Sequence, residues 1–181
     1  LTGEELLTDY SKVELNRIID TGANFTVATI RTPASVMESL SDIHLKLPII
    51  AMDGAVLYDL KDNRYLKTYS MSYNKAQKII EILREEDVNF FINVVVEDVL
   101  IIYYHHLENE AETQIYKQMR KSPHRNYVRR NLPEGEEVAY FMMVDQTEKI
   151  QKIYERLKVK IHSQEYKMLC YASKDYPGYS Y

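Results

Sequence analysis

The sequence contains one cysteine, no long hydrophobic run and only five glycines, which do not cluster. The lone Cys170 excludes an internal disulfide and a cysteine-rich metal site. No stretch reaches the roughly 18 uncharged apolar residues that a membrane-spanning helix needs, and residues 1–20 show no signal sequence. The scattered glycines exclude a glycine-rich phosphate loop. We therefore expect a globular protein of the cytoplasm that does not bind a membrane.

Positive charge is also scarce overall. The formal net charge of -4 argues against a protein whose main task is to bind nucleic acid. The five histidines are scattered along the chain and predict no metal site. The exception is residues 117–130, where six lysines and arginines occur without an acidic residue. This segment has two interpretations, a solvated loop or a site for a phosphorylated or otherwise anionic ligand.

Apolar periodicity in the first third of the chain predicts alternating helices and strands. Residues 11–21 and 33–44 have the spacing of amphipathic helices, whereas residues 25–29 and 49–52 are short apolar strands. A strand, a helix and a second strand in this order form a βαβ unit. Such a unit implies a parallel sheet covered by helices.

The pattern changes after Asp53 and Gly54, because strands then outnumber helices. The expected elements, in chain order, are a hairpin at 56–59 and 65–70, a helix at 74–86, strands at 89–96 and 99–104, a helix at 107–119, a strand at 138–144, a helix at 150–157, and strands at 159–162 and 166–172. This order predicts a sheet with helices on one face. The fold class is therefore α/β, with a second α/β layer domain following the first.

Polar residues follow both strands of the βαβ unit. Thr29 ends the first strand and Arg31 comes two residues later, while Thr32 and Pro33 suit the first positions of the next helix. A hydroxyl, a guanidinium and the positive end of a helix dipole together describe an anion site, and phosphate is the anion they favour. The alternative is an ordinary strand-to-helix junction. Residues 53–55 follow the second strand, so we expect them at the same edge of the sheet.

Two stretches at these positions resemble a known family. Residues 25–32 read FTVATIRT and residues 47–59 read LPIIAMDGAVLYD. They are similar to the ATGRT and PxIxxNGAxIYD motifs of the haloacid dehalogenase (HAD) superfamily, in its Cof-type group of sugar-phosphate and nucleotide phosphatases. The resemblance covers essentially the whole chain. It implies an incomplete Rossmann-like core at residues 1–60, an inserted α+β cap domain at 61–175, and a return segment to the core at 176–181.

The resemblance also implies a function. Family members are magnesium-dependent phosphatases in which an aspartate attacks phosphorus and other side chains hold the phosphoryl oxygens. Thr29 matches the phosphate-holding hydroxyl and Arg31 the arginine of the same motif. Asp53, Gly54 and Ala55 match the segment that typically reads Asn-Gly-Ala, and we expect them to contact the substrate. The expected ligand is a small phosphorylated molecule, with Mg2+ as the cofactor.

The departures from the family pattern concern catalysis. Family members begin with Asp-x-Asp-Gly-Thr-Leu-Leu, but an alignment on Leu6 and Leu7 places the nucleophile position on Leu1 and the acid/base position on Gly3. The sequence also lacks the later motif lysine and the Gly-Asp metal-binding segment. We therefore assign no catalytic residue and no metal ligand. The expectation is a hydrolase-like family member that is catalytically deficient as this chain.

An incomplete core leaves apolar sheet edges exposed. Two explanations stay open: the chain is a fragment or a divergent relative of a phosphatase, or a partner subunit, such as a second copy in a homo-oligomer, covers the edges. Two substitutions bear on the site itself. Ile30 replaces the usual glycine, and Asp53 replaces asparagine, which adds negative charge where an anion would approach.

A non-catalytic ligand-binding or subunit-assembly module is the alternative function. The sixteen tyrosines offer large contact area with polar tips. Residues 103–106, which read Tyr-Tyr-His-His, end one of the predicted strands. They either face a cleft between the two domains or simply alternate between inward and outward packing.

Overall fold

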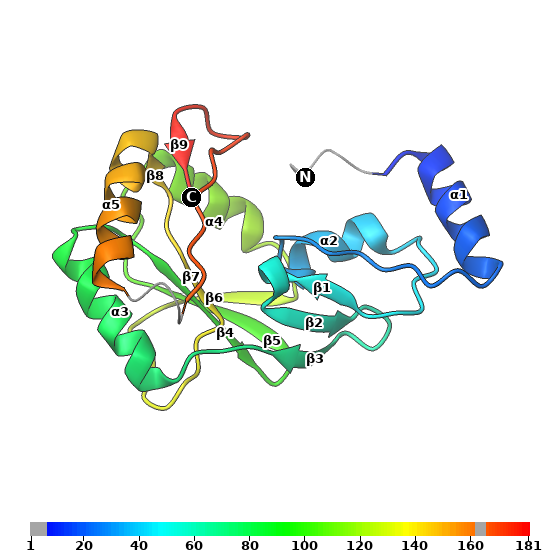
Figure 1. Ribbon diagram of the computed structural model, residues 1–181, viewed down its shortest axis with the longest axis horizontal. Coiled ribbons are helices and arrows are strands. Elements are labelled where there is room, and N and C mark those ends of the chain that lie inside the picture. The colour runs from blue at the N-terminus through cyan, green and yellow to red at the C-terminus, as the bar shows by residue number, and fades with distance from the viewer. Residues whose placement is uncertain (1–6, 162–165) are drawn as a thin grey trace. The chain divides into compact units, whose positions relative to one another are not determined.

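The computed structural model describes residues 7–161 and 166–181 (Figure 1). The chain divides into two compact units, Leu1–Tyr69 and Ser70–Tyr181, called the first and the second unit below. The motif positions aligned on Leu1 and Gly3 lie outside the described residues. Within the described ranges, every helix is too short or too polar to cross a membrane.

The first unit combines two helices with a small sheet. Its elements are α1 (Asp9–Asp20), α2 (Pro33–Leu40), β1 (Ile49–Ala51), the short 3₁₀ helix η1 (Met52–Gly54), β2 (Val56–Asp59) and β3 (Arg64–Thr68). The strands β1, β2 and β3 form an antiparallel sheet in that order. The two predicted helices and the predicted hairpin are thus confirmed. The second helix stops before residue 44, because the Ser41 hydroxyl donates to the carbonyl of Glu38 and closes the last turn.

The predicted strand at residues 25–29 is reduced to one parallel bridge between Ala28 and Ile50. Two hydrogen bonds hold it, from the N–H of Thr29 to the Ile50 carbonyl and from the N–H of Ile50 to the Val27 carbonyl, both at 2.9 Å. The parallel direction agrees with the predicted βαβ order. Because Ala28 is exposed, little apolar burial supports a longer strand.

One face of the first sheet is covered by α2. Ile49, Val56 and Tyr58 are buried on this face, and the Tyr58 hydroxyl donates to the sulfur of Met37 in α2 at 3.9 Å. Burying one such side chain contributes about 1.5 to 3 kcal/mol. Ile50 points to the other face and remains 40% exposed. The described part of the first unit therefore covers the two faces of its sheet unequally.

The second unit is built on a four-stranded sheet with the order β6-β5-β4-β7. Its elements are α3 (Tyr73–Glu85), β4 (Phe91–Val96), β5 (Val99–Tyr104), α4 (Glu110–Met119), β6 (Arg125–Arg129), β7 (Tyr140–Met142), β8 (Asp145–Gln146), α5 (Thr147–Lys160) and β9 (Tyr179–Ser180). β5 and β6 run parallel, and the other neighbours run antiparallel. A two-residue turn at Glu97 and Asp98, both with positive φ, joins β4 to β5.

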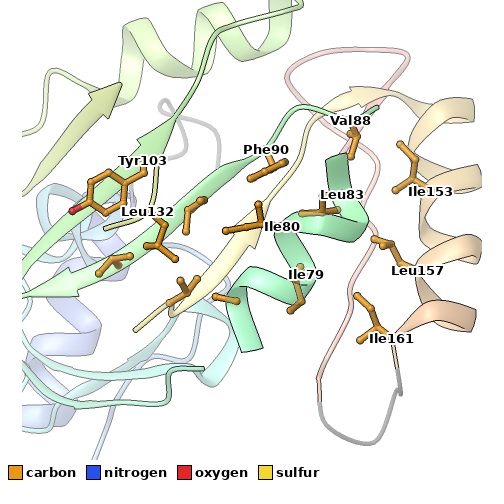
Figure 2. Packing of buried hydrophobic residues seen from close by; sticks show 14 residues of the cluster. Ile79, Ile80, Leu83, Val88, Phe90, Tyr103, Leu132, Ile153, Leu157 and Ile161 are labelled. Atoms are coloured by element: carbon orange, nitrogen blue, oxygen red, sulfur yellow. The ribbon is translucent and has the colours of Figure 1, made fainter. Parts of the chain in front are cut away.

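The main core of this unit lies between one face of the four-stranded sheet and the helices α3 and α5. Figure 2 shows Ile80 and Leu83 of α3 and Leu157 of α5 within this core. Ile92 of β4 and Tyr103 of β5 are opposite each other in the sheet register and belong to the same core. The apolar spacing of the two helices therefore predicted their buried faces correctly.

The opposite face of the sheet is covered by α4, which corrects the expectation of helices on one face only. Tyr104 and Tyr127 belong to this opposite face, because side chains alternate along a strand. The ring of Tyr116 in α4 lies 5.5 Å from the ring of Tyr104 and 5.2 Å from that of Tyr127. The helix reaches this face as the crossover between the parallel strands β5 and β6.

Several element boundaries in the second unit differ from the predictions. The basic segment 117–130 is not a loop throughout, since α4 extends to Met119 and β6 follows. The prediction of a strand at 159–162 is wrong for residues 159 and 160, which belong to α5. His162 lies outside the described residues. The expected strand at 166–172 is reduced to one bridge from Ala172 to Ser180. Near the end of the chain, β9 pairs with β8 inside the second unit.

Candidate anion-binding site

Backbone hydrogen bonds bring the two motif segments together at one end of β1. The N–H of Asp53 donates to the carbonyl of Thr29 at 3.1 Å, and the N–H of Met52 donates to the carbonyl of Arg31 at 2.8 Å. Thr29 is in turn held to Ile50 of β1 by the parallel bridge. These contacts place Thr29, Arg31 and Asp53 along one rim of the first unit, as the βαβ order predicts.

The side chain of Thr29 is half-buried at this rim. Its hydroxyl oxygen accepts a hydrogen bond from the backbone N–H of Arg31 at 3.2 Å. A hydroxyl that accepts in this way keeps its own O–H, which can donate to a ligand oxygen. The same contact fixes the backbone of the turn that carries Arg31.

The N-terminus of α2 comes next in the chain. Thr32 has the backbone conformation of an N-cap and Pro33 lies in the first turn, as predicted. The side chain of Thr32 makes no capping hydrogen bond, however, and its hydroxyl pairs with the hydroxyl of Ser35 at 2.9 Å. Pro33 has no N–H, and the N–H of Ser35 donates to the carbonyl of Thr32 at 2.9 Å. This helix start therefore offers an anion mainly the positive end of the helix dipole.

The turn at η1 has an unusual backbone. Met52, Asp53 and Gly54 all have positive φ, at 53°, 55° and 92°. Aspartate and asparagine tolerate this left-handed region better than most side chains, and glycine adopts it freely. Ala55 closes the turn by donating its N–H to the carbonyl of Met52 at 3.0 Å. The conformation therefore explains the Asp-Gly pair, and it sets a half-buried carboxylate at the rim.

The described residues do not form a magnesium site. Among residues 7–161 and 166–181, no group of three or more histidine, cysteine, aspartate or glutamate side chains is arranged to hold a metal ion. Mg2+ takes oxygen ligands in near-octahedral geometry, and Asp53 supplies a single carboxylate at the rim. The hydroxyl, guanidinium and amide donors of this rim suit an anion rather than a cation.

Of the six cations of residues 117–130, one lies in α4, two lie in β6 and three lie in the segments that follow these elements. The guanidinium of Arg120 lies 4.9 Å from the ring centre of Tyr116 and donates to its hydroxyl at 2.8 Å. Arg125 is only 5% exposed. Arg129 donates from Nε to the carbonyl of His105 at 2.7 Å. These three arginines make contacts within the protein that the sequence pattern did not reveal.

Residues 103–106 alternate between packed faces, which was one of the two expectations for them. Tyr103 belongs to the main core, while Tyr104 belongs to the aromatic cluster under α4. His105 is half-buried, and its pKa is lowered mainly by burial. His106 pairs through Nε2 with the carboxylate of Glu108 at 2.6 Å. The strand end therefore carries both core and surface side chains.

Comparison with known proteins gives a family match over most of the chain. The family described as haloacid dehalogenase-like hydrolase matches residues 1–175. A curated Mycoplasma pneumoniae protein named "Putative phosphatase" is 33% identical over 72 residues. That alignment covers 38% of this chain and 25% of the other protein.

Solved structures share the fold at low sequence identity. A haloacid dehalogenase-like hydrolase from Bacillus subtilis gives a TM-score of 0.67 at 14% identity, over 99% of this chain and 68% of that chain. A sugar phosphatase of haloacid dehalogenase subclass IIB gives a TM-score of 0.59 at 16% identity, over 99% of this chain and 64% of that chain. The chain thus spans about two thirds of the length of these structures, and the likeness supports an α/β fold with a Rossmann-like core.

Proposed function

This chain belongs to the haloacid dehalogenase-like hydrolase family, and from that membership we propose that its Thr29–Arg31 rim binds the phosphoryl group of a phosphate monoester. The Thr29 hydroxyl donates to one phosphoryl oxygen and the Arg31 guanidinium pairs with another. The start of α2 adds the positive end of the helix dipole. Asp53, Gly54 and Ala55 contact the remainder of the ligand.

The proposal depends on the two backbone hydrogen bonds that join the motif segments, from Asp53 to Thr29 and from Met52 to Arg31. They hold a donor, a cation and a turn of fixed backbone at one end of β1. A phosphoryl group bound by Thr29 therefore has its ester substituent within reach of the turn. Without this pairing, the two motifs would be separate segments with no common ligand.

A sugar phosphate is the ligand class we favour, and a nucleotide is the alternative. One solved structure with this fold is a sugar phosphatase, and the Mycoplasma pneumoniae relative is named as a phosphatase. The half-buried carboxylate of Asp53 accepts hydrogen bonds from hydroxyl groups and repels further negative charge. A hydroxyl-rich body next to the phosphoryl group suits this carboxylate better than a second phosphate.

We also propose that this chain, located in the cytoplasm, binds such a ligand without hydrolysing it. Family chemistry uses an aspartate nucleophile and Mg2+, but the aligned nucleophile and acid/base positions carry Leu1 and Gly3. A leucine cannot attack phosphorus, and a glycine cannot transfer a proton. The described residues also lack a cluster that could hold the metal ion.

Titration calorimetry with glucose 6-phosphate and with inorganic phosphate tests the binding site. We expect saturable binding that Thr29→Ala weakens at least tenfold. Thr21→Ala is the matched control, because Thr21 is a threonine at the end of α1 whose hydroxyl donates to the carbonyl of Ile18 at 2.8 Å. Binding that survives Thr29→Ala unchanged would refute the assignment of the rim.

Hydrolysis of p-nitrophenyl phosphate in the presence of Mg2+ tests the proposed lack of turnover. We expect no hydrolysis above background at any Mg2+ concentration. Hydrolysis that depends on Mg2+ and disappears in Thr29→Ala would refute the proposed lack of turnover. The same result would still support a phosphate site at Thr29.

Exposed apolar side chains favour a second candidate function, assembly with another copy of the chain. In the first unit, Ile30, Ile50 and Leu66 are 59%, 40% and 47% exposed. A homo-oligomer that buries the face of Ile50 would remove apolar surface from water. Sedimentation velocity over a range of concentrations tests this candidate. A molecular mass that rises with protein concentration supports assembly, provided that the Ile50→Thr variant stays monomeric. A natural sequence that is monomeric at every concentration contradicts it.

A further inference from the structure

A cavity of about 250 Å³ opens within the second unit, beside α3 and near the ends of β4 and β5. Its floor is apolar and consists of Ile80, Phe90, Ile92 and Leu132, each at most 5% exposed. Three of these side chains, Ile80, Phe90 and Leu132, are labelled in Figure 2. Every lining residue belongs to the second unit. The cavity is therefore separate from the rim at Thr29.

The polar side of the cavity is formed by Arg84, His105 and Asn131. Arg84 donates from Nη2 to the side-chain oxygen of Asn131 at 3.2 Å. Asn131 is also close enough to His105 to raise the pKa of its imidazole, against the larger lowering effect of burial. In addition, the His105 carbonyl accepts from Arg129 at 2.7 Å, which fixes the end of β5. Asn131 thus holds the guanidinium of Arg84, and His105 lines the same space.

The charges around the cavity are positive. Burial is the main cause that lowers the pKa of the His105 imidazole, and the neighbouring charges of Arg84 and Arg129 lower it further. None of the residues that line the cavity is an aspartate or a glutamate. A metal ion would find no carboxylate ligand there, whereas an anion would find a guanidinium already held by a hydrogen bond.

We propose that this cavity binds a small organic anion, a carboxylate carried on an apolar ring or short chain, with Arg84 pairing with the carboxylate and Phe90, Ile92 and Leu132 enclosing the apolar body. The Asn131 amide and the His105 ring complete the polar contacts. A bare inorganic anion would leave the apolar floor in contact with water, so the apolar body contributes to binding. This site is independent of the proposed phosphate rim.

The size of the cavity limits the ligand. A volume of about 250 Å³ corresponds to roughly eight water molecules at about 30 Å³ each. An aromatic monocarboxylate of the size of benzoate fits such a space, whereas a nucleotide does not. Benzoate is therefore the probe for the experiment.

Titration of the full chain with benzoate tests the site, using calorimetry together with ligand-observed NMR. We expect saturable binding that Arg84→Ala weakens at least tenfold and that Arg84→Lys restores in part, because lysine keeps the charge but loses the bidentate geometry. Lys78→Ala is the matched control. It removes one positive charge from an exposed position of the same helix and does not line the cavity, so binding should stay within twofold.

Four further ligand and variant comparisons decide between outcomes. Benzyl alcohol should bind at least tenfold more weakly than benzoate, and equal binding would overturn the role of the anion. Inorganic phosphate should not compete with benzoate, and full competition would overturn the role of the apolar floor. Gln77→Trp, which fills the cavity from α3, should abolish benzoate binding, and retention would place the ligand elsewhere. Thr29→Ala should leave benzoate binding unchanged, so this test is separate from that of the phosphate rim.

Discussion

The carboxylate of Glu112 lies 2.9 Å from the side-chain amide nitrogen of Asn89, and both side chains are buried in the second unit. Glu112 also accepts the backbone N–H of Glu108 at 2.6 Å, while Asn109 caps α4 by accepting the backbone N–H of Glu112 at 2.9 Å. Burial raises the pKa of Glu112, although these donors act to lower it. The network ties the start of α4 to the segment that leads into β4.

Glu112→Ala should lower the free energy of unfolding by about 2 to 4 kcal/mol, since it leaves the cap donors and one N–H of the buried Asn89 amide without an acceptor. The other N–H of this amide still donates to the carbonyl of His106. Gln118→Ala, at an exposed position of the same helix, should change it by no more than about 0.5 kcal/mol. Urea unfolding at neutral pH, followed by circular dichroism, measures both. Equal effects of the two substitutions would show that the network does not stabilise the unit.

Gly54→Ala should destabilise the first unit by about 1 to 2 kcal/mol, because its φ of 92° lies in the region that L side chains avoid. The added methyl group would meet no atom within 4 Å, so the cost is backbone strain alone. Thermal unfolding compares this variant with Asp53→Asn, which keeps a side chain suited to positive φ and should leave stability within about 0.5 kcal/mol. A neutral Gly54→Ala would contradict the described turn.

Asp53→Asn should increase the affinity for inorganic phosphate by about three- to tenfold, because it removes a negative charge from the rim where the anion binds. The gain should shrink as salt is added, since ions screen the interaction. Titrations at low and high ionic strength measure this dependence. Asp62→Asn, which removes the same charge from an exposed hairpin position, serves as the control and should have no effect. Unchanged affinity in Asp53→Asn would argue against an anion site next to the turn.

Glu86 should contribute to the loss of stability in acid. Its side chain lies 2.8 Å from Lys160 and 2.7 Å from Arg156, and hydrogen bonds from these two residues lower its pKa below the ordinary value of 4.5. The stabilisation is present above this ordinary pKa and is lost as the pH falls through the lower pKa of the folded state. Unfolding free energies measured from pH 6 to pH 3 should therefore fall less steeply for Glu86→Gln than for the natural sequence. Identical curves below pH 4.5 would rule out this contribution.

The sequence predicted best those helices in which the spacing of apolar residues determines the buried face. Ile79 and Leu83 in α3, and Ile153 and Leu157 in α5, recur at spacings of four residues and are all buried. The strand β6 had no such signal, because its Arg125 occupies a buried position that a hydrophobic pattern would assign to an apolar residue. Arg125 lies on the same face of the sheet as Tyr127, so its burial depends on the tertiary fold.

The same distinction applies to the two candidate sites. The nearness of Thr29 and Asp53 could be predicted, because neighbouring parallel strands deliver their ends to the same edge of a sheet. The polar side of the cavity could not be predicted in this way. Arg84 and Asn131 are 47 positions apart and come from a helix end and a loop with no shared motif. Their meeting is set by how α3 packs on the sheet, which local patterns do not encode.

The adjacent residues Tyr103 and Tyr104 serve two different cores, one under α3 and α5 and the other under α4. Deleting a single residue from the turn at Glu97 and Asp98 would exchange the two sides for every position of β5, whereas substitutions there leave the register intact. For anyone who remodels this protein, the length of that connection is therefore a stricter constraint than its composition.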